Sequence, residues 1–162
     1  MIALITTFLG AGHLRPAPGT WGSLAALPAA WVAATLLGPT GFALATCAVF
    51  ALGLWATEQA TRGMADHDPS EIVIDEVAGQ WVALIPVVIG AGHAGVPLLA
   101  LWPGWIAAFA LFRLFDIWKP GPVGWADRKG DAMGVMLDDV IAGALAAVGV
   151  IALAALSHGL LM

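Results

Sequence analysis

Two pairs of adjacent acids are the residues of this chain best suited to chemistry. Asp75-Glu76 and Asp138-Asp139 each lie close to the start of a long apolar run. Neighbouring carboxylates repel each other unless a cation binds between them, and a charge at membrane depth is costly without a partner. Mg²⁺ prefers oxygen ligands and commonly bridges carboxylates to a substrate phosphate. We therefore predict a Mg²⁺ site with Asp75, Glu76, Asp138 and Asp139 as its ligands, although helix caps solvated at the interface would explain the same acids.

Basic residues accompany these acids. Arg113, Asp116 and Lys119 recur every three residues, which places them along one side of a helix if the helix continues that far. A guanidinium binds phosphate as a bidentate fork and an ammonium binds it as a point charge. We expect Arg113 and Lys119 to bind phosphate, with Asp116 as a further metal ligand or as the residue that orients Arg113. An internal ion-pair ladder is the alternative.

An early Gly/Pro-rich stretch offers further anion-binding groups. Arg15 supplies a guanidinium, and Thr20 and Ser23 supply hydroxyls among glycines just before a predicted helix. Such a stretch predicts an anion cradle. Thr20 or Ser23 capping that helix explains the same residues without a ligand.

Four residues are secondary candidates: Asp68, His67, Asp127 and Arg128. The triplet Asp66-His67-Asp68 invites comparison with aspartyl phosphatases but lacks the preceding strand, so attack by water is the default and Asp68 or Asp75 the covalent alternative. Asp127 and Arg128 lie in a loop of mixed charge, where a solvated loop and a headgroup contact are equally compatible.

The elements that must position these residues are membrane helices. The 162 residues are 60% hydrophobic and 10% charged, with a mean hydropathy of +0.91. A spanning helix needs about 20 mainly apolar residues, and uninterrupted apolar runs exclude barrel strands. We predict an all-α, polytopic helix bundle formed by one domain over residues 1–162, with a short interfacial or re-entrant helix near the N-terminus. Its five or so predicted spans are 21–37, 41–57, 74–92, 96–115 and 140–160.

The basic residues also predict an orientation. Arg15, Arg62 and the bases from Arg113 to Lys129 fall in connections that share one side of a five-span topology. The positive-inside rule assigns that side to the cytoplasm, so every charged cluster faces it. The net charge of −5 argues against nucleic-acid binding.

Four ordered motifs make the chain resemble the phosphatidylglycerophosphatase A family. The resemblance implies a phospholipid substrate and Mg²⁺-dependent hydrolysis of phosphatidylglycerophosphate to phosphatidylglycerol and phosphate, at the cytoplasmic face of a bacterial inner membrane. The motifs are Ala17-Pro18-Gly19-Thr20 with Gly22-Ser23-Leu24, Asp68-Pro69 with Ile72-Val73-Ile74-Asp75-Glu76 and Gly79, Phe112-Arg113 with Asp116 and Lys119-Pro120, and Gly134-Val135-Met136 with Asp138-Asp139 and Gly143.

On this hypothesis Asp75, Glu76, Asp116 and Asp139 are the catalytic residues. A small ion or proton-coupled transporter is the rival function, because intramembrane acids paired with bases also mark ion pathways. The centres of the predicted spans hold few polar residues, Gln80 and Thr46 among them, and the acids gather on one side. Catalysis at the membrane surface is therefore favoured. A structural lipid-binding subunit is a third alternative, and the oligomeric state stays open.

Overall fold

The computed structural model describes residues 1–64 and 68–161, and all regular secondary structure in these ranges is helical. This confirms the predicted all-α class. The elements in chain order are α1 (Ile2–Thr6), η1 (Ala11–His13), α2 (Pro18–Ala60), α3 (Ile74–Ala94), η2 (Leu98–Leu101), α4 (Trp102–Trp118), α5 (Pro122–Asp127) and α6 (Ala132–Leu161).

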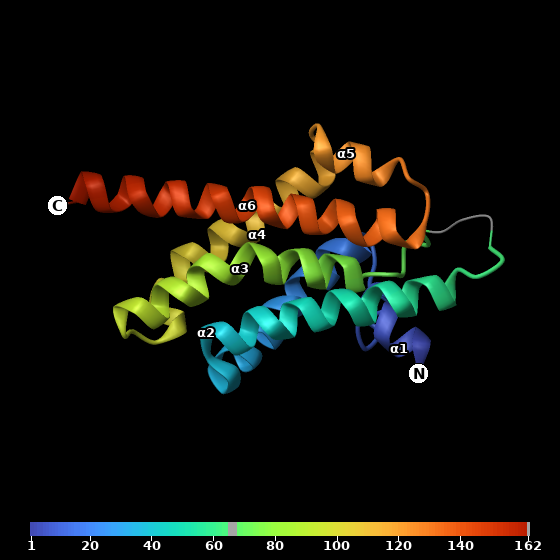
Figure 1. Ribbon diagram of the computed structural model, residues 1–162, viewed down its shortest axis with the longest axis horizontal. Helices are drawn as coiled ribbons and strands as arrows, with labels where there is room; N and C mark the ends of the chain where they lie inside the picture. Colours follow the sequence, from blue (N-terminus) through green and yellow to red (C-terminus); the bar gives the residue numbers. More distant parts are fainter. Residues whose placement is uncertain (65–67, 162) are drawn as a thin grey trace.

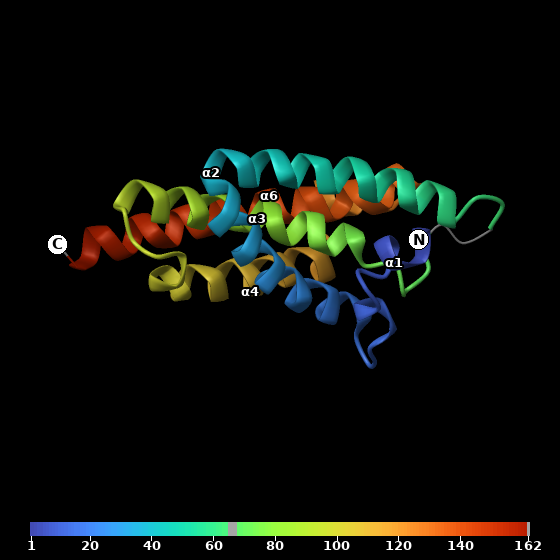
Figure 2. The same ribbon diagram turned by 90° about the horizontal axis from the view of Figure 1, so that it is seen from below.

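Four helices in the described ranges are long and apolar enough to cross a membrane, and the first of them contains two predicted spans. Within α2, Gly38 adopts φ 67°, ψ −179°, and Pro39 follows it without an amide hydrogen to continue the helix. The two arms on either side of Gly38 run in opposite directions in both views (Figures 1 and 2). The predicted spans 21–37 and 41–57 are these arms, so the count of about five spans is approximate.

Two helices begin at other residues than the predicted spans. The span predicted at 96–115 begins as helix α4 only at Trp102, after the short turn η2, and continues to Trp118. The last helix begins at Ala132 rather than at 140, because Asp131 Oδ1 accepts a hydrogen bond from Gly134 N at 2.6 Å and caps the helix start. Asp138 and Asp139 therefore lie inside α6 and not at its positive end. Asp75 and Glu76 do lie in the first turn of α3, as predicted.

The helix ends that carry the charged residues gather at one end of the molecule. The start of α3 and the start of α6 lie on the same side as the N-terminus, while the C-terminus lies at the opposite end (Figure 1). The short helix α1 is far too short to span, and its Thr6 carbonyl accepts a hydrogen bond from Val73 N at 2.8 Å. The N-terminal segment is thus hydrogen-bonded to Val73, the residue that directly precedes α3.

Helix α3 is the most buried long helix and packs against α2, α4 and α6. The Trp81 indole donates to the Ala26 carbonyl at 3.1 Å, which fixes α3 against α2. On its other side, a Cβ at Gly143 of α6 would collide with the Gly79 carbonyl, and a Cβ at Gly79 would collide with the Asp139 carbonyl. The two glycines let α3 and α6 approach closely and bring Asp139 next to the start of α3.

Replacing Gly143 with alanine should separate these two helices. The new methyl group meets rigid backbone, so we expect Gly143→Ala to lower the free energy of unfolding by about 1–3 kcal/mol. Thermal unfolding of the purified protein in detergent would measure this. Gly159→Ala is the matched control, since Gly159 lies in the same helix with nothing within 4 Å of an added Cβ. Equal midpoints for the two variants would contradict close packing at Gly143.

Candidate active site

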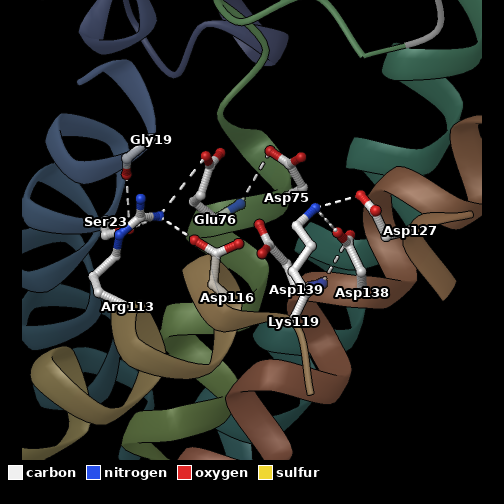
Figure 3. A network of polar contacts seen from close by, with 10 residues as sticks. All are labelled: Gly19, Ser23, Asp75, Glu76, Arg113, Asp116, Lys119, Asp127, Asp138 and Asp139. Carbon is white, nitrogen blue, oxygen red and sulfur yellow. Dashed lines mark hydrogen bonds and ion pairs between the residues drawn. The ribbon is translucent and has the colours of Figure 1, made fainter. Parts of the chain in front are cut away.

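Three carboxylates from two helices form the centre of the site. Asp75 and Glu76 in the first turn of α3 and Asp139 in α6 place carboxylate oxygens within 4.8 Å of one another (Figure 3). Asp75 is 6% and Asp139 3% exposed. Oxygen atoms at this spacing are the ligands that a hard divalent cation takes, and a cation would relieve their mutual repulsion. We refer to Asp75, Glu76 and Asp139 as the acid trio.

Asp138 does not join the trio, although it is adjacent to Asp139. Successive residues of a helix point about 100° apart, and Asp138 Oδ2 lies 2.9 Å from Lys119 Nζ instead. Its other oxygen accepts a hydrogen bond from Asp139 N at 3.0 Å. Of the four predicted metal ligands, the structure therefore brings three together and turns the fourth toward a base.

Arg113 of α4 lies on the other side of Glu76. Its Nη1 forms an ion pair with Asp116, lies 4.0 Å from Glu76 Oε1 and donates to Ser23 Oγ at 3.5 Å. The Ser23 hydroxyl in turn donates to the Gly19 carbonyl at 2.8 Å. Asp116 and Ser23 together hold the guanidinium beside the acid trio, as Figure 3 shows.

Lys119 follows the end of α4 and connects three helices. It adopts a left-handed conformation with φ 50°, and its ammonium pairs with both Asp127 of α5 and Asp138 of α6. Partial burial lowers the pKa of Lys119, but the hydrogen bonds and charges of the two aspartates outweigh burial and raise it above the usual range. Lys119 is therefore a cation at any physiological pH, placed next to the trio by way of Asp138.

The sequence left two alternatives open, an ion-pair ladder for the bases and helix capping for Thr20 and Ser23. Arg113 and Asp116 do pair along α4, but the helix ends at Trp118, so Lys119 leaves that side and no continuous ladder forms. The N-cap of α2 is Ala17, and its side chain forms no cap. The capping interpretation of Thr20 and Ser23 is therefore wrong.

The remaining predicted residues lie around or outside this cluster. Asp68 is close enough to Asp75 for their charges to repel each other. The exposed Arg15 donates to Ser70 Oγ at 3.2 Å, in the segment that leads to α3. Thr20 lies half-buried inside α2, Arg128 is exposed at the end of α5, and His67 lies outside the described residues.

Sequence reasoning assigned no individual role to Gly19, which lies beside Glu76, or to Gln80, one turn further along α3. A Cβ at Gly19 would collide with Glu76 Oε1, so a larger residue there would displace the Glu76 carboxylate. Gln80 is fully buried one turn beyond Glu76, and neither of its amide atoms has a hydrogen-bond partner among the described residues. The signal for Gln80 was present in the sequence: an amide inside an otherwise apolar span.

The apolar helices and the acid trio with its neighbouring bases together define a helical membrane protein with a largely buried, charged site at one end of its bundle. A sequence model of the phosphatidylglycerophosphatase A family matches residues 4–154. The chain belongs to the phosphatidylglycerophosphatase A family and is a lipid phosphatase, which confirms the resemblance drawn from its motifs.

Three relatives cover most of the chain. "Phosphatidylglycerophosphatase A" of Haemophilus influenzae is 39% identical over 153 residues, covering 94% of this chain and 88% of the relative. The Escherichia coli protein of the same name is 35% identical over 146 residues, with 89% and 78% covered. A Bacteroides thetaiotaomicron protein provisionally named a phosphatidylinositol-3-phosphatase is 39% identical over 146 residues, with 86% and 85% covered. No solved structure matches the chain.

Proposed function

We propose that the protein removes the terminal phosphate of phosphatidylglycerophosphate, giving phosphatidylglycerol and inorganic phosphate, in a Mg²⁺-dependent reaction. One observation carries the proposal: Glu76 belongs to the acid trio and also lies 4.0 Å from the Arg113 guanidinium. A cation-binding group and a phosphate-binding group thus adjoin, as phosphate ester hydrolysis requires. The names of the Haemophilus influenzae and Escherichia coli relatives support this substrate.

The donor set of the trio fits magnesium. Three carboxylates, largely withdrawn from solvent, offer only hard oxygen ligands, and Glu76 Oε2 is buried without a hydrogen-bond partner in the described part of the chain. Asp75, Glu76 and Asp139 would hold the ion, while Asp138 serves to orient Lys119. When bound, Mg²⁺ would polarise the phosphate and lower the pKa of a coordinated water.

The chain's own bases meet the main electrostatic demand of the reaction. Charge spreads over the equatorial oxygens of the transferred phosphoryl group, and fixed cations stabilise it without reorganisation. Arg113, held by Asp116 and Ser23, and Lys119, held by Asp127 and Asp138, supply such fixed cations. Water remains the default nucleophile, with attack by Asp75 or Asp68 as the covalent alternative.

The orientation of the site is part of the proposal. Arg15, Arg62 and Lys129 belong to the connections before α2, after α2 and before α6, and these connections lie at the charged end of the bundle (Figure 1). The positive-inside rule assigns this end to the cytoplasmic face. Because the relatives are bacterial proteins, we propose the bacterial inner membrane as the location. A lipid whose headgroup lies in the cytoplasmic leaflet would reach the site without crossing the bilayer.

Phosphate release from phosphatidylglycerophosphate by the purified protein in detergent tests the proposal. We expect release with Mg²⁺, loss of release with a chelator, and recovery when Mg²⁺ is restored. Phosphatidylinositol-3-phosphate should be assayed in parallel, since one relative carries a name with that substrate. Faster release from the inositol lipid would contradict the proposed headgroup, and no release from either lipid by the folded protein would contradict the function.

A further inference from the structure

Gln80 is a buried polar residue that helix packing does not explain. Its side chain is 0% exposed, and neither Oε1 nor Nε2 has a hydrogen-bond partner among the residues described. In a membrane helix neither water nor lipid supplies the missing bonds, so such an amide destabilises the folded protein. An apolar side chain of similar volume would pack at this position without that penalty.

Glu76, one turn before Gln80 on α3, and Arg113, which lies beside Glu76, each have a buried polar atom without a partner among the described residues. Gln80 lies one turn from Glu76, a spacing that puts two side chains on the same face of α3. Glu76 Oε2 is a buried acceptor without a partner, and Arg113, whose Nη1 lies 4.0 Å from Glu76 Oε1, has a buried Nε donor without one. A glutamine amide offers one acceptor and two hydrogens to donate. The amide therefore offers the kind of donor that Glu76 Oε2 lacks and the kind of acceptor that Arg113 Nε lacks.

We propose that Gln80 is a positioning residue of the site. When the acid trio binds a divalent cation, the Gln80 amide donates to Glu76 Oε2 and fixes that carboxylate in its ligating orientation. Groups that orient a metal ligand typically change metal affinity by about 10–100-fold. The inference rests on the proposed function, because it assigns Gln80 a role in loading that same site.

Two apolar variants, Gln80→Met and Gln80→Leu, separate this role from a structural one. We expect both to unfold at the same temperature as the parent or higher when Mg²⁺ is chelated, because an unsatisfied amide is removed. We also expect the Mg²⁺ concentration for half-maximal phosphate release to rise by about 10–100-fold. The rise in unfolding temperature on adding Mg²⁺ should shrink in parallel, which reports on binding without activity.

Thr46→Val is the matched control, since Thr46 is a buried polar residue whose hydroxyl already donates to the Phe42 carbonyl at 2.9 Å. It should leave the Mg²⁺ response unchanged. Lower unfolding temperatures or loss of folding in both Gln80 variants would overturn the proposal by showing that the amide makes structural bonds. If the parent is active and the stable Gln80 variants respond to Mg²⁺ as the parent does, the proposed role of Gln80 is wrong while the proposed function stands. A parent without any Mg²⁺ response would overturn the proposed function and this inference together.

Discussion

Asp139→Asn should reduce Mg²⁺-dependent phosphate release by at least about 100-fold while leaving the protein folded. The substitution keeps the shape of the side chain but removes one of three charges that would hold the cation. The same substitution should stabilise the folded protein when no cation is bound. Because the three carboxylates of the trio lie within 4.8 Å of one another, removing one charge relieves repulsion and should raise the unfolding temperature in the presence of a chelator.

Asp75→Asn should behave in the same way, whereas Glu58→Gln should not. Glu58 is an exposed acid of α2, so neutralising it changes the net charge equally without touching the trio. Phosphate release and thermal unfolding, each with and without Mg²⁺, would be measured for all three variants. An active Asp139→Asn protein with an unchanged Mg²⁺ requirement would show that the trio is not the metal site. Loss of activity together with a lower unfolding temperature would point to a structural role for these acids.

The gross fold could be predicted from sequence because lipid leaves the backbone few choices. Runs such as 74–92 and 41–57 are long and apolar enough to require helices, and both are helical in the structure. Helix ends were harder to predict, because hydropathy marks only the apolar part of a helix. Asp138 and Asp139 interrupt the apolar run, so a helix start was expected at 140, although the short apolar stretch before them already belongs to α6, which begins at Ala132.

The membership of the site was partly predictable, but its internal pairing was not. Charge and spacing brought Asp75, Glu76, Asp139 and Arg113 into one hypothesis, and the structure places them together. Which acid of the pair at 138 and 139 turns toward α3 depends on the rotation of α6. That rotation is set by the contact of Gly143 with the Gly79 carbonyl, a long-range packing feature that periodicity along one helix does not contain.

Arg113→Lys should lower kcat by about 100–1000-fold, although it conserves the positive charge. The Arg113 guanidinium contacts Asp116 and Ser23 through Nη1 and keeps further hydrogens for a phosphate, whereas an ammonium is a compact point charge without the fork. A lysine at this position can still neutralise Asp116, so the bundle should fold. The transition state gathers more charge on its equatorial oxygens than the bound substrate does, which is why kcat should change more than KM.

Steady-state kinetics with phosphatidylglycerophosphate in mixed micelles would separate the two parameters. Arg62→Lys is the control, because Arg62 is exposed beyond the end of α2 and the same substitution there should leave both parameters unchanged. A rise in KM with kcat preserved would mean that Arg113 binds substrate and transition state equally, which would restrict it to headgroup recognition. Retained kcat and KM would contradict the role of Arg113 in binding the phosphate beside the acid trio, because a phosphate held by the guanidinium should respond to the loss of the fork.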